Sequence, residues 1–249
     1  MRFLIVPKLN LIVGWNPKVA CTTIKYLLLT KLGHKIEGNI HMDMLTEENL
    51  ESGKYDIYDF FNPKFENIDL NSYTKICVIR DPYERLISGI RQKSSFLCKL
   101  KKYGDLSEST ISEFLQNLKT HEYIEGHFRP QTMVKVKQYD IDISLLEFIN
   151  IYNFKFDHVI SLDQMDKFYE LLELPYIEEK IGNHLTTYND NDKVNYYNLT
   201  IQDISDKYNN KWSSNINSWF TQDNIQLINE LYKDDFEWLS KNGFDYKIN

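Results

Sequence analysis

Two segments of this chain lead from a short apolar run through a basic turn into a helical pattern, and this arrangement restricts the folds open to it. The first segment is residues 11–23, in which Lys18 stands in the turn. The second is residues 76–82, in which an apolar run ends at Arg80 and continues into Asp81 and Pro82. Asp is a favoured N-cap residue, and Pro is favoured at the first helical position. Each segment therefore predicts a strand, a turn and a helix start.

The same alternation recurs along the chain. Runs rich in β-branched residues alternate with segments of helical period; the runs lie at 10–15, 75–80 and 157–161, and the helical segments near 22–32, 82–93, 111–119, 163–173 and 222–240. Such alternation predicts βαβ units. We therefore expect an α/β fold, a P-loop-like three-layer sandwich with a central, mostly parallel sheet flanked by helices. Ligands of such sheets bind beyond the carboxyl ends of the strands, where both basic turns are predicted.

Length and composition predict a globular protein. The chain has 249 residues, of which 42% are hydrophobic and 26% charged, so it can build one sizeable core and is unlike disordered sequences. We expect a single domain over residues 1–249, with a ligand-binding core at about 10–175 and a helical region at about 183–249. Residues 183–217 are rich in Asn and Tyr and lack periodicity, so we expect a long loop or lid there.

Charge and cysteine content argue against several classes of protein. The formal net charge of −7 and the pI near 5.4 would repel nucleic acids and anionic lipid surfaces. Three cysteines are too few for a disulfide framework, which indicates a reducing compartment. The sequence has neither a signal-peptide core nor an apolar run of the roughly 18 residues that a membrane span needs. We expect a soluble, cytoplasmic protein that binds no nucleic acid.

The first basic turn has the chemistry of an anion site. A helix start leaves backbone N–H groups unpaired and carries the positive end of the helix dipole. Lys18 would add a mobile charge, and the hydroxyl groups of Thr22 and Thr23 would add donors. The turn thus resembles a P-loop without its glycines. The alternative is that Thr22 or Thr23 caps the helix and that Lys18 is a solvated turn residue.

The second basic turn offers a matching cation. Arg80 should stand at the end of its strand, and Ser88 follows Asp81 by nearly two helical turns, on the face opposite Leu86 and Ile90. Arg80 and Ser88 could therefore hold one phosphate between them. Residues 80–102 contain seven basic and two acidic residues, a cationic island in an acidic protein. The alternative is a solvated basic helix face.

Taken in this order, the two segments resemble the PAPS-dependent sulfotransferases, and more closely their carbohydrate branch. Residues 17–23 resemble that family's 5′-phosphosulfate loop, and residues 79–88 resemble its 3′-phosphate motif. Residues 127–131, 156–165 and 228–236 are similar to further family motifs, so the resemblance spans about residues 12–236. Ser161 and Leu162 depart from the small and aromatic residues usual in the family. The membrane anchor and disulfides of animal members are not seen, so we expect a microbial or viral member.

The resemblance implies a parallel-stranded core that binds 3′-phosphoadenosine 5′-phosphosulfate (PAPS), with a hydroxyl group, usually of a sugar, as acceptor. Lys18 would neutralise the charge on the leaving phosphate, and no metal is expected. The implied donor-binding set is Lys18, Val19, Ala20, Cys21, Thr22, Thr23, Arg80 and Ser88. Cys21 also stands at a helix start, where thiols become reactive, but a small residue packed behind the loop is the simpler interpretation.

An acceptor hydroxyl needs a general base, and histidine titrates in the useful range. His41 is our first candidate, because residues 40–42 resemble the segment that carries the catalytic histidine of a heparan 2-O-sulfotransferase branch. His127 is the second, although it could instead stabilise a loop. The other histidines lack a matching context, and His158 is expected to be structural; they are His34, His121, His158 and His184.

Two other functions remain open at the level of sequence. One is a non-catalytic nucleotide- or glycan-binding module on the same fold. The other is a P-loop-like nucleotide kinase, which would need a glycine-rich loop and an acidic, metal-holding strand end, neither of which is visible. The sequence predicts neither the identity of the acceptor nor the oligomeric state.

Overall fold

A computed structural model describes residues 1–100, 105–121, 125–136, 141–175, 194–206, 212–213 and 215–248. The chain folds into two compact units. The first comprises Met1–Arg80 and Gln131–Asn183, and the second comprises Asp81–Pro130 and His184–Asn249. The single domain, with its core at about 10–175, stays a prediction. His184, two lysines of the cationic island (Lys101 and Lys102) and about half of the expected lid at 183–217 lie outside the described residues.

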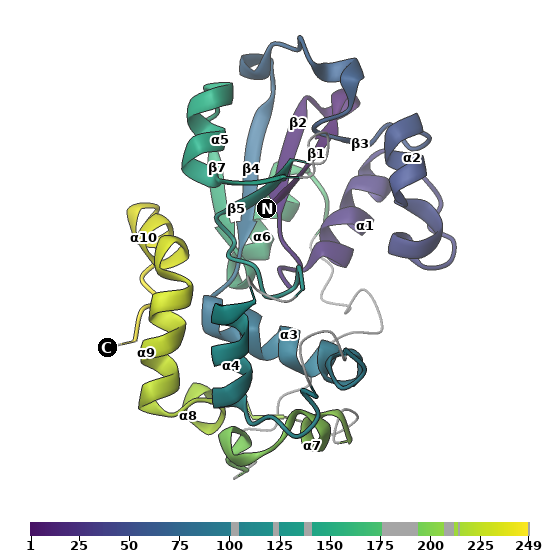
Figure 1. Cartoon of the computed structure of the whole chain (residues 1–249). Coiled ribbons are helices and arrows are strands. Elements are labelled where there is room, and N and C mark those ends of the chain that lie inside the picture. Colours follow the sequence, from purple (N-terminus) through teal and green to yellow (C-terminus); the bar gives the residue numbers. More distant parts are fainter. Residues whose placement is uncertain are drawn as a thin grey trace. The chain divides into compact units, whose positions relative to one another are not determined.

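The first unit is built on a five-stranded sheet in the order β3-β1-β2-β4-β7. Its strands are β1 (Arg2–Val6), β2 (Leu11–Trp15), β3 (Tyr58–Asp59), β4 (Thr74–Ile79) and β7 (His158–Ser161). Strands β2, β4 and β7 are parallel, and β1 runs antiparallel to its neighbours β2 and β3. Four strands therefore point the same way, and the predicted α/β fold with a mostly parallel sheet is confirmed (Figure 1).

Helices cover both faces of this sheet. On one face, α1 (Cys21–Lys31) and α6 (Met165–Leu171) share a hydrophobic core with Val13 and Val78. On the other face, Phe3 stacks on Phe148 of α5 (Leu145–Tyr152), with 4.6 Å between the ring centroids. Successive strand residues point to opposite faces, so apolar runs such as that of β1 fill both layers. The three predicted layers are present.

Several elements of the first unit were not expected from the sequence. Strand β1 turns into β2 through a 3₁₀ helix (Pro7–Leu9) that ends at Asn10 in a left-handed conformation (φ 47°). A separate two-stranded antiparallel sheet pairs β5 (Met133–Val136) with β6 (Ile141–Ser144). Helix α2 (Glu47–Ser52) and a π-helical turn (Ile40–Met44) follow α1. These elements are short, and a few residues give too little periodicity to reveal them.

The second unit is helical over the residues described. It contains α3 (Pro82–Leu97), α4 (Ile111–Thr120), α7 (Ile201–Asp206), α8 (Ile216–Trp219), α9 (Gln222–Leu231) and α10 (Lys233–Lys241). The predicted helix start at Asp81 and Pro82 is confirmed, because the Asp81 carboxylate accepts hydrogen bonds from the backbone N–H groups of Tyr83 and Glu84. The helix predicted near 222–240 is interrupted at Tyr232.

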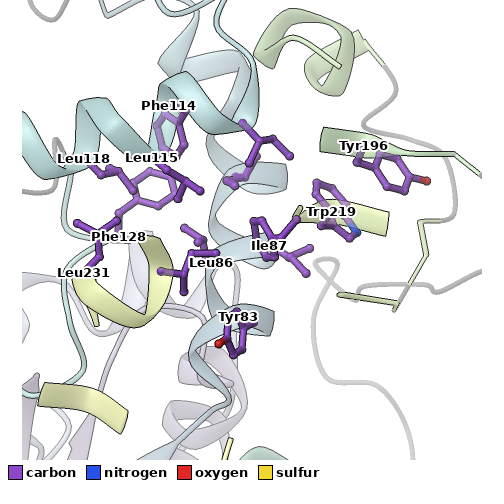
Figure 2. Packing of buried hydrophobic residues seen from close by; sticks show 14 of the residues in the cluster. Tyr83, Leu86, Ile87, Phe114, Leu115, Leu118, Phe128, Tyr196, Trp219 and Leu231 are labelled. Atoms are coloured by element: carbon purple, nitrogen blue, oxygen red, sulfur yellow. The ribbon is translucent and has the colours of Figure 1, made fainter. Parts of the chain in front are cut away.

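Aromatic and aliphatic side chains fill the core of this unit. Figure 2 shows Leu86, Phe128 and Leu231 gathered with the leucines of α4. Trp219 stacks on Tyr196, with 4.3 Å between the ring centroids. Burial of such side chains is the main stabilising term in a fold of this kind. The tryptophan and tyrosine of this stack therefore serve the core.

Candidate functional site

The loop between β2 and α1 adopts a conformation that usually requires glycine. Lys18 has φ 72° and Ala20 has φ 58°, both in the left-handed region, whereas Val19 between them does not. Such alternation turns successive backbone N–H groups toward one centre, as in anion-binding loops. Left-handed backbone at a residue with a side chain costs about 1–2 kcal/mol. Strain of this kind gathers at functional sites, so this loop is the first candidate for one.

Helix α1 begins without a side-chain cap. Its N-cap is Ala20, which makes no side-chain hydrogen bond to the first-turn N–H groups. Thr22 and Thr23 lie inside the first turn, so the alternative in which one of them is the N-cap is wrong. An anion bound at the loop would therefore interact favourably with the positive end of α1.

The second basic residue is tied directly to the first loop. Arg80 follows the last residue of β4 and is 7% exposed. Its guanidinium Nη1 donates a hydrogen bond to the carbonyl oxygen of Lys18 at 3.2 Å. Both residues belong to the first unit. The two segments that the sequence singled out thus meet through a buried cation at the carboxyl ends of adjacent parallel strands.

Gln131 fixes the backbone of Arg80. Its Oε1 accepts a hydrogen bond from the Arg80 N–H (3.0 Å), and its Nε2 donates one to the Arg80 carbonyl oxygen (2.7 Å). Asn16, in the first loop, donates from Nδ2 to the Gln131 carbonyl oxygen at 3.1 Å. Gln131 is 0% exposed. The sequence placed this residue in a family-like motif but gave it no role; its partners are too distant along the chain to be found from spacing.

We expect replacement of Gln131 by Met to lower the free energy of unfolding by about 2–6 kcal/mol. The substitution keeps the length of the side chain but leaves a buried N–H and a buried carbonyl group of Arg80 without their partner, at about 1–3 kcal/mol each when unsatisfied. Urea denaturation measures the change. The matched control is Gln116→Met on the exposed face of α4, where we expect a change within about 0.5 kcal/mol. Equal effects of the two substitutions would contradict the role of Gln131.

His41 lies against the first turns of α1. The π-helical turn (Ile40–Met44) presents it, and the Asn39 side chain accepts hydrogen bonds from the N–H groups of His41 and Met42. His41 Nε2 lies 2.8 Å from Thr22 Oγ1 and 3.8 Å from Cys21 Sγ, and its Nδ1 lies 2.9 Å from Lys25 Nζ. The sequence did not indicate this contact with Lys25.

Ser88 and His127 belong to the second unit. His127 Nδ1 lies 2.7 Å from the Glu125 carboxylate, which also accepts a hydrogen bond from the His127 backbone N–H. Burial alone would raise the pKa of Glu125, but the hydrogen bonds from His127, with the charges of His127 and Lys93, lower it below its usual value. Ser88 is 6% exposed on α3.

A family model described as "Sulfotransferase family" matches residues 1–242. The chain belongs to the sulfotransferase family. No curated protein and no solved structure matches it. The protein is therefore a transferase, and its acceptor bears a hydroxyl group.

Three cations of the island, which the sequence left open as an anion site or a solvated helix face, contact other residues of the second unit. Arg85 is buried and donates hydrogen bonds to the carbonyl oxygens of His127 and Arg129. Arg91 lies over the ring of Trp212, and Lys93 lies 3.8 Å from the Glu125 carboxylate. The hydrophobic period of α3 indicates one covered face, but these contacts show that other residues also pack against its basic side chains. These three cations therefore stabilise the second unit.

Three further histidines are among the described residues. His34 contacts the carbonyl oxygen of Tyr55, His121 ends α4, and His158 is exposed at the first residue of β7. Over the described ranges, no group of three His, Cys, Asp or Glu side chains is arranged to hold a metal ion. Within the same ranges, no helix is long and apolar enough to cross a membrane.

Proposed function

We propose that this sulfotransferase takes the sulfuryl group from PAPS and transfers it to a hydroxyl group of a carbohydrate. The observation that carries the donor assignment is the hydrogen bond from Arg80 to the Lys18 carbonyl oxygen, because it joins the two segments that are expected to bind opposite ends of PAPS. The strained loop and the uncapped start of α1 support an anionic ligand at the same place. The resemblance to the carbohydrate branch supports the acceptor class.

In the proposed reaction, the acceptor oxygen attacks sulfur while the bond between sulfur and the 5′-phosphate oxygen breaks. Such transfers pass through a loose, in-line transition state, so the enzyme mainly positions the reactants and neutralises charge. Lys18 stabilises the negative charge that builds on the departing phosphate. Backbone N–H groups of residues 20–23 bind the 5′-phosphate together with Thr22 and Thr23.

Arg80 and Ser88 are the proposed ligands of the 3′-phosphate. Arg80 is a buried guanidinium, which is well suited to a phosphate because its fork of N–H donors matches the phosphate oxygens. Ser88 is proposed on the resemblance of residues 79–88 to the family's 3′-phosphate motif. ATP has no 3′-phosphate, so these two residues would favour PAPS over ATP.

We propose His127 as the general base that accepts the proton of the acceptor hydroxyl. The ionised Glu125 carboxylate can accept hydrogen bonds but cannot donate them, so it favours the tautomer with the proton on Nδ1. Nε2 then carries the lone pair and can take a proton. The products are the sulfated acceptor and 3′-phosphoadenosine 5′-phosphate (PAP), with the proton on His127.

Isothermal titration calorimetry of PAP, AMP and ATP tests the donor assignment. We expect PAP to bind at least about tenfold more tightly than AMP, because a charge-assisted hydrogen bond to one phosphate is worth about 1.5–3 kcal/mol. Incubation of labelled PAPS with a glycan panel, followed by mass spectrometry of the products, tests the acceptor class. Tight binding of ATP without preference for a 3′-phosphate would contradict the donor, and sulfation of non-carbohydrate hydroxyls alone would contradict the acceptor.

A further inference from the structure

His41 touches α1 at two residues that share one face of the helix. Thr22 and Lys25 are three positions apart, so their side chains lie one above the other. One ring nitrogen of His41 contacts each of them, at 2.8 Å from Thr22 Oγ1 and 2.9 Å from Lys25 Nζ. The imidazole thus bridges the amine of Lys25 and the hydroxyl group of Thr22.

The Trp15 ring favours the ammonium form of Lys25, the usual form of lysine at neutral pH, and opposes the effect of burial on the charge. Lys25 is 5% exposed, and its Nζ lies 4.8 Å from the centre of the Trp15 ring, on the ring face. A cation over an indole face is stabilised by the ring quadrupole, which does not act on a neutral amine in this way. An ammonium group has donors but no acceptor. Lys25 therefore donates to His41 Nδ1.

This donor fixes the tautomer of the imidazole. A neutral imidazole that accepts at Nδ1 carries its proton on Nε2, and an imidazolium could not accept at Nδ1 at all. Nε2 therefore donates to Thr22 Oγ1. Both ring nitrogens of His41 are then engaged, and neither presents a lone pair for the proton of an acceptor hydroxyl.

We propose that His41 is a positioning residue that holds the Thr22 hydroxyl as a donor to the 5′-phosphate, and that it is not the general base. With its oxygen accepting from His41, the Thr22 hydroxyl has one hydrogen left to donate, and it stands in the first turn of α1, where the N–H groups are uncapped. Hydrogen bonds in such a chain polarise one another, so the charge of Lys25 strengthens the last donor. The proposal rests on the proposed function, since it takes the anion to be the 5′-phosphate of PAPS.

A double-mutant cycle on PAP affinity tests this role without any acceptor. We expect His41→Ala and Thr22→Val each to weaken PAP binding about tenfold, and the double variant to weaken it about tenfold rather than a hundredfold, because both changes remove one hydrogen-bond chain. A general base for the acceptor would leave PAP affinity unchanged. Isothermal titration calorimetry gives the four affinities.

Conservative and matched variants complete the test. His41→Gln supplies an amide donor but no base, so we expect it to bind PAP more tightly than His41→Ala. His34→Ala, which removes a histidine outside the loop, is the matched control and should bind PAP as the wild type does. Unchanged PAP affinity in His41→Ala, or independent effects that multiply in the double variant, would overturn the positioning role while leaving PAPS as the donor. A wild type that does not bind PAP would overturn the proposed function and the positioning role together.

Discussion

Replacement of Lys18 by Ala is expected to lower kcat about a hundredfold to a thousandfold. In the proposed mechanism the ammonium group of Lys18 stabilises charge that appears on the 5′-phosphate only as the sulfuryl group leaves, and loss of one such group typically has an effect of this size. The Arg80 guanidinium contacts the backbone carbonyl of Lys18, so the substitution leaves that contact in place. Turnover of labelled PAPS with a glycan acceptor measures the change.

Because the backbone of Lys18 is left-handed, Lys18→Gly is a matched control for Lys18→Ala. Lys18→Gly also lacks the ammonium group, but glycine adopts φ 72° without steric cost. We expect both variants to lose turnover. We also expect the free energy of unfolding, measured by urea denaturation, to be about 1 kcal/mol higher for Lys18→Gly than for Lys18→Ala. Substantial turnover in either variant would show that the leaving-group charge is neutralised elsewhere. Equal stabilities would show that the loop is not strained at this residue.

The sequence predicted the framework of the site better than its contacts. Residues 11–15 and 74–79 form parallel strands, as their apolar runs indicated, because buried strands need continuous β-branched and apolar residues. The helix start at Pro82 was predictable, since capping is a local interaction. The loop conformation at Lys18 was not, because lysine gives no local signal for a left-handed backbone. Its strain is maintained by surrounding structure that short-range patterns do not describe.

The side-chain partners within the site were also beyond the sequence. Gln131 contacts Arg80, 51 residues away, and the amide of Asn16, 115 residues away. Nothing in the sequence distinguishes Lys25 from the other residues of its predicted helix. In the structure it is buried and contacts His41 and Trp15. Ser88 was expected on a polar face of α3 but is buried. A hydrophobic period identifies the apolar face of a helix, but it does not show whether the polar face is also covered. Long-range packing decided each of these cases.

Replacement of His127 by Ala is expected to lower kcat about a hundredfold to ten-thousandfold while leaving PAP affinity unchanged. General base catalysis contributes this much when the base is well placed, and a base for the acceptor has no part in holding the donor. Glu125→Gln removes the charge that orients His127, so we expect a smaller loss, on the order of tenfold. His121→Ala, at the exposed end of α4 in the same unit, should retain wild-type turnover. Full turnover in His127→Ala would mean that another group takes the proton.

The ionised Glu125 carboxylate should also make the free energy of unfolding depend on pH. Its pKa is lower in the folded protein than its usual value, because the hydrogen bonds and positive charges around it outweigh its burial. The ionised form therefore stabilises the fold above the unfolded-state pKa of about 4.3, and this stabilisation is lost as the pH falls through the lower folded-state pKa. We expect the free energies of unfolding of wild type and Glu125→Gln to differ at neutral pH and to converge in acid. A difference that stays constant with pH would contradict an ionised Glu125 as the partner of His127.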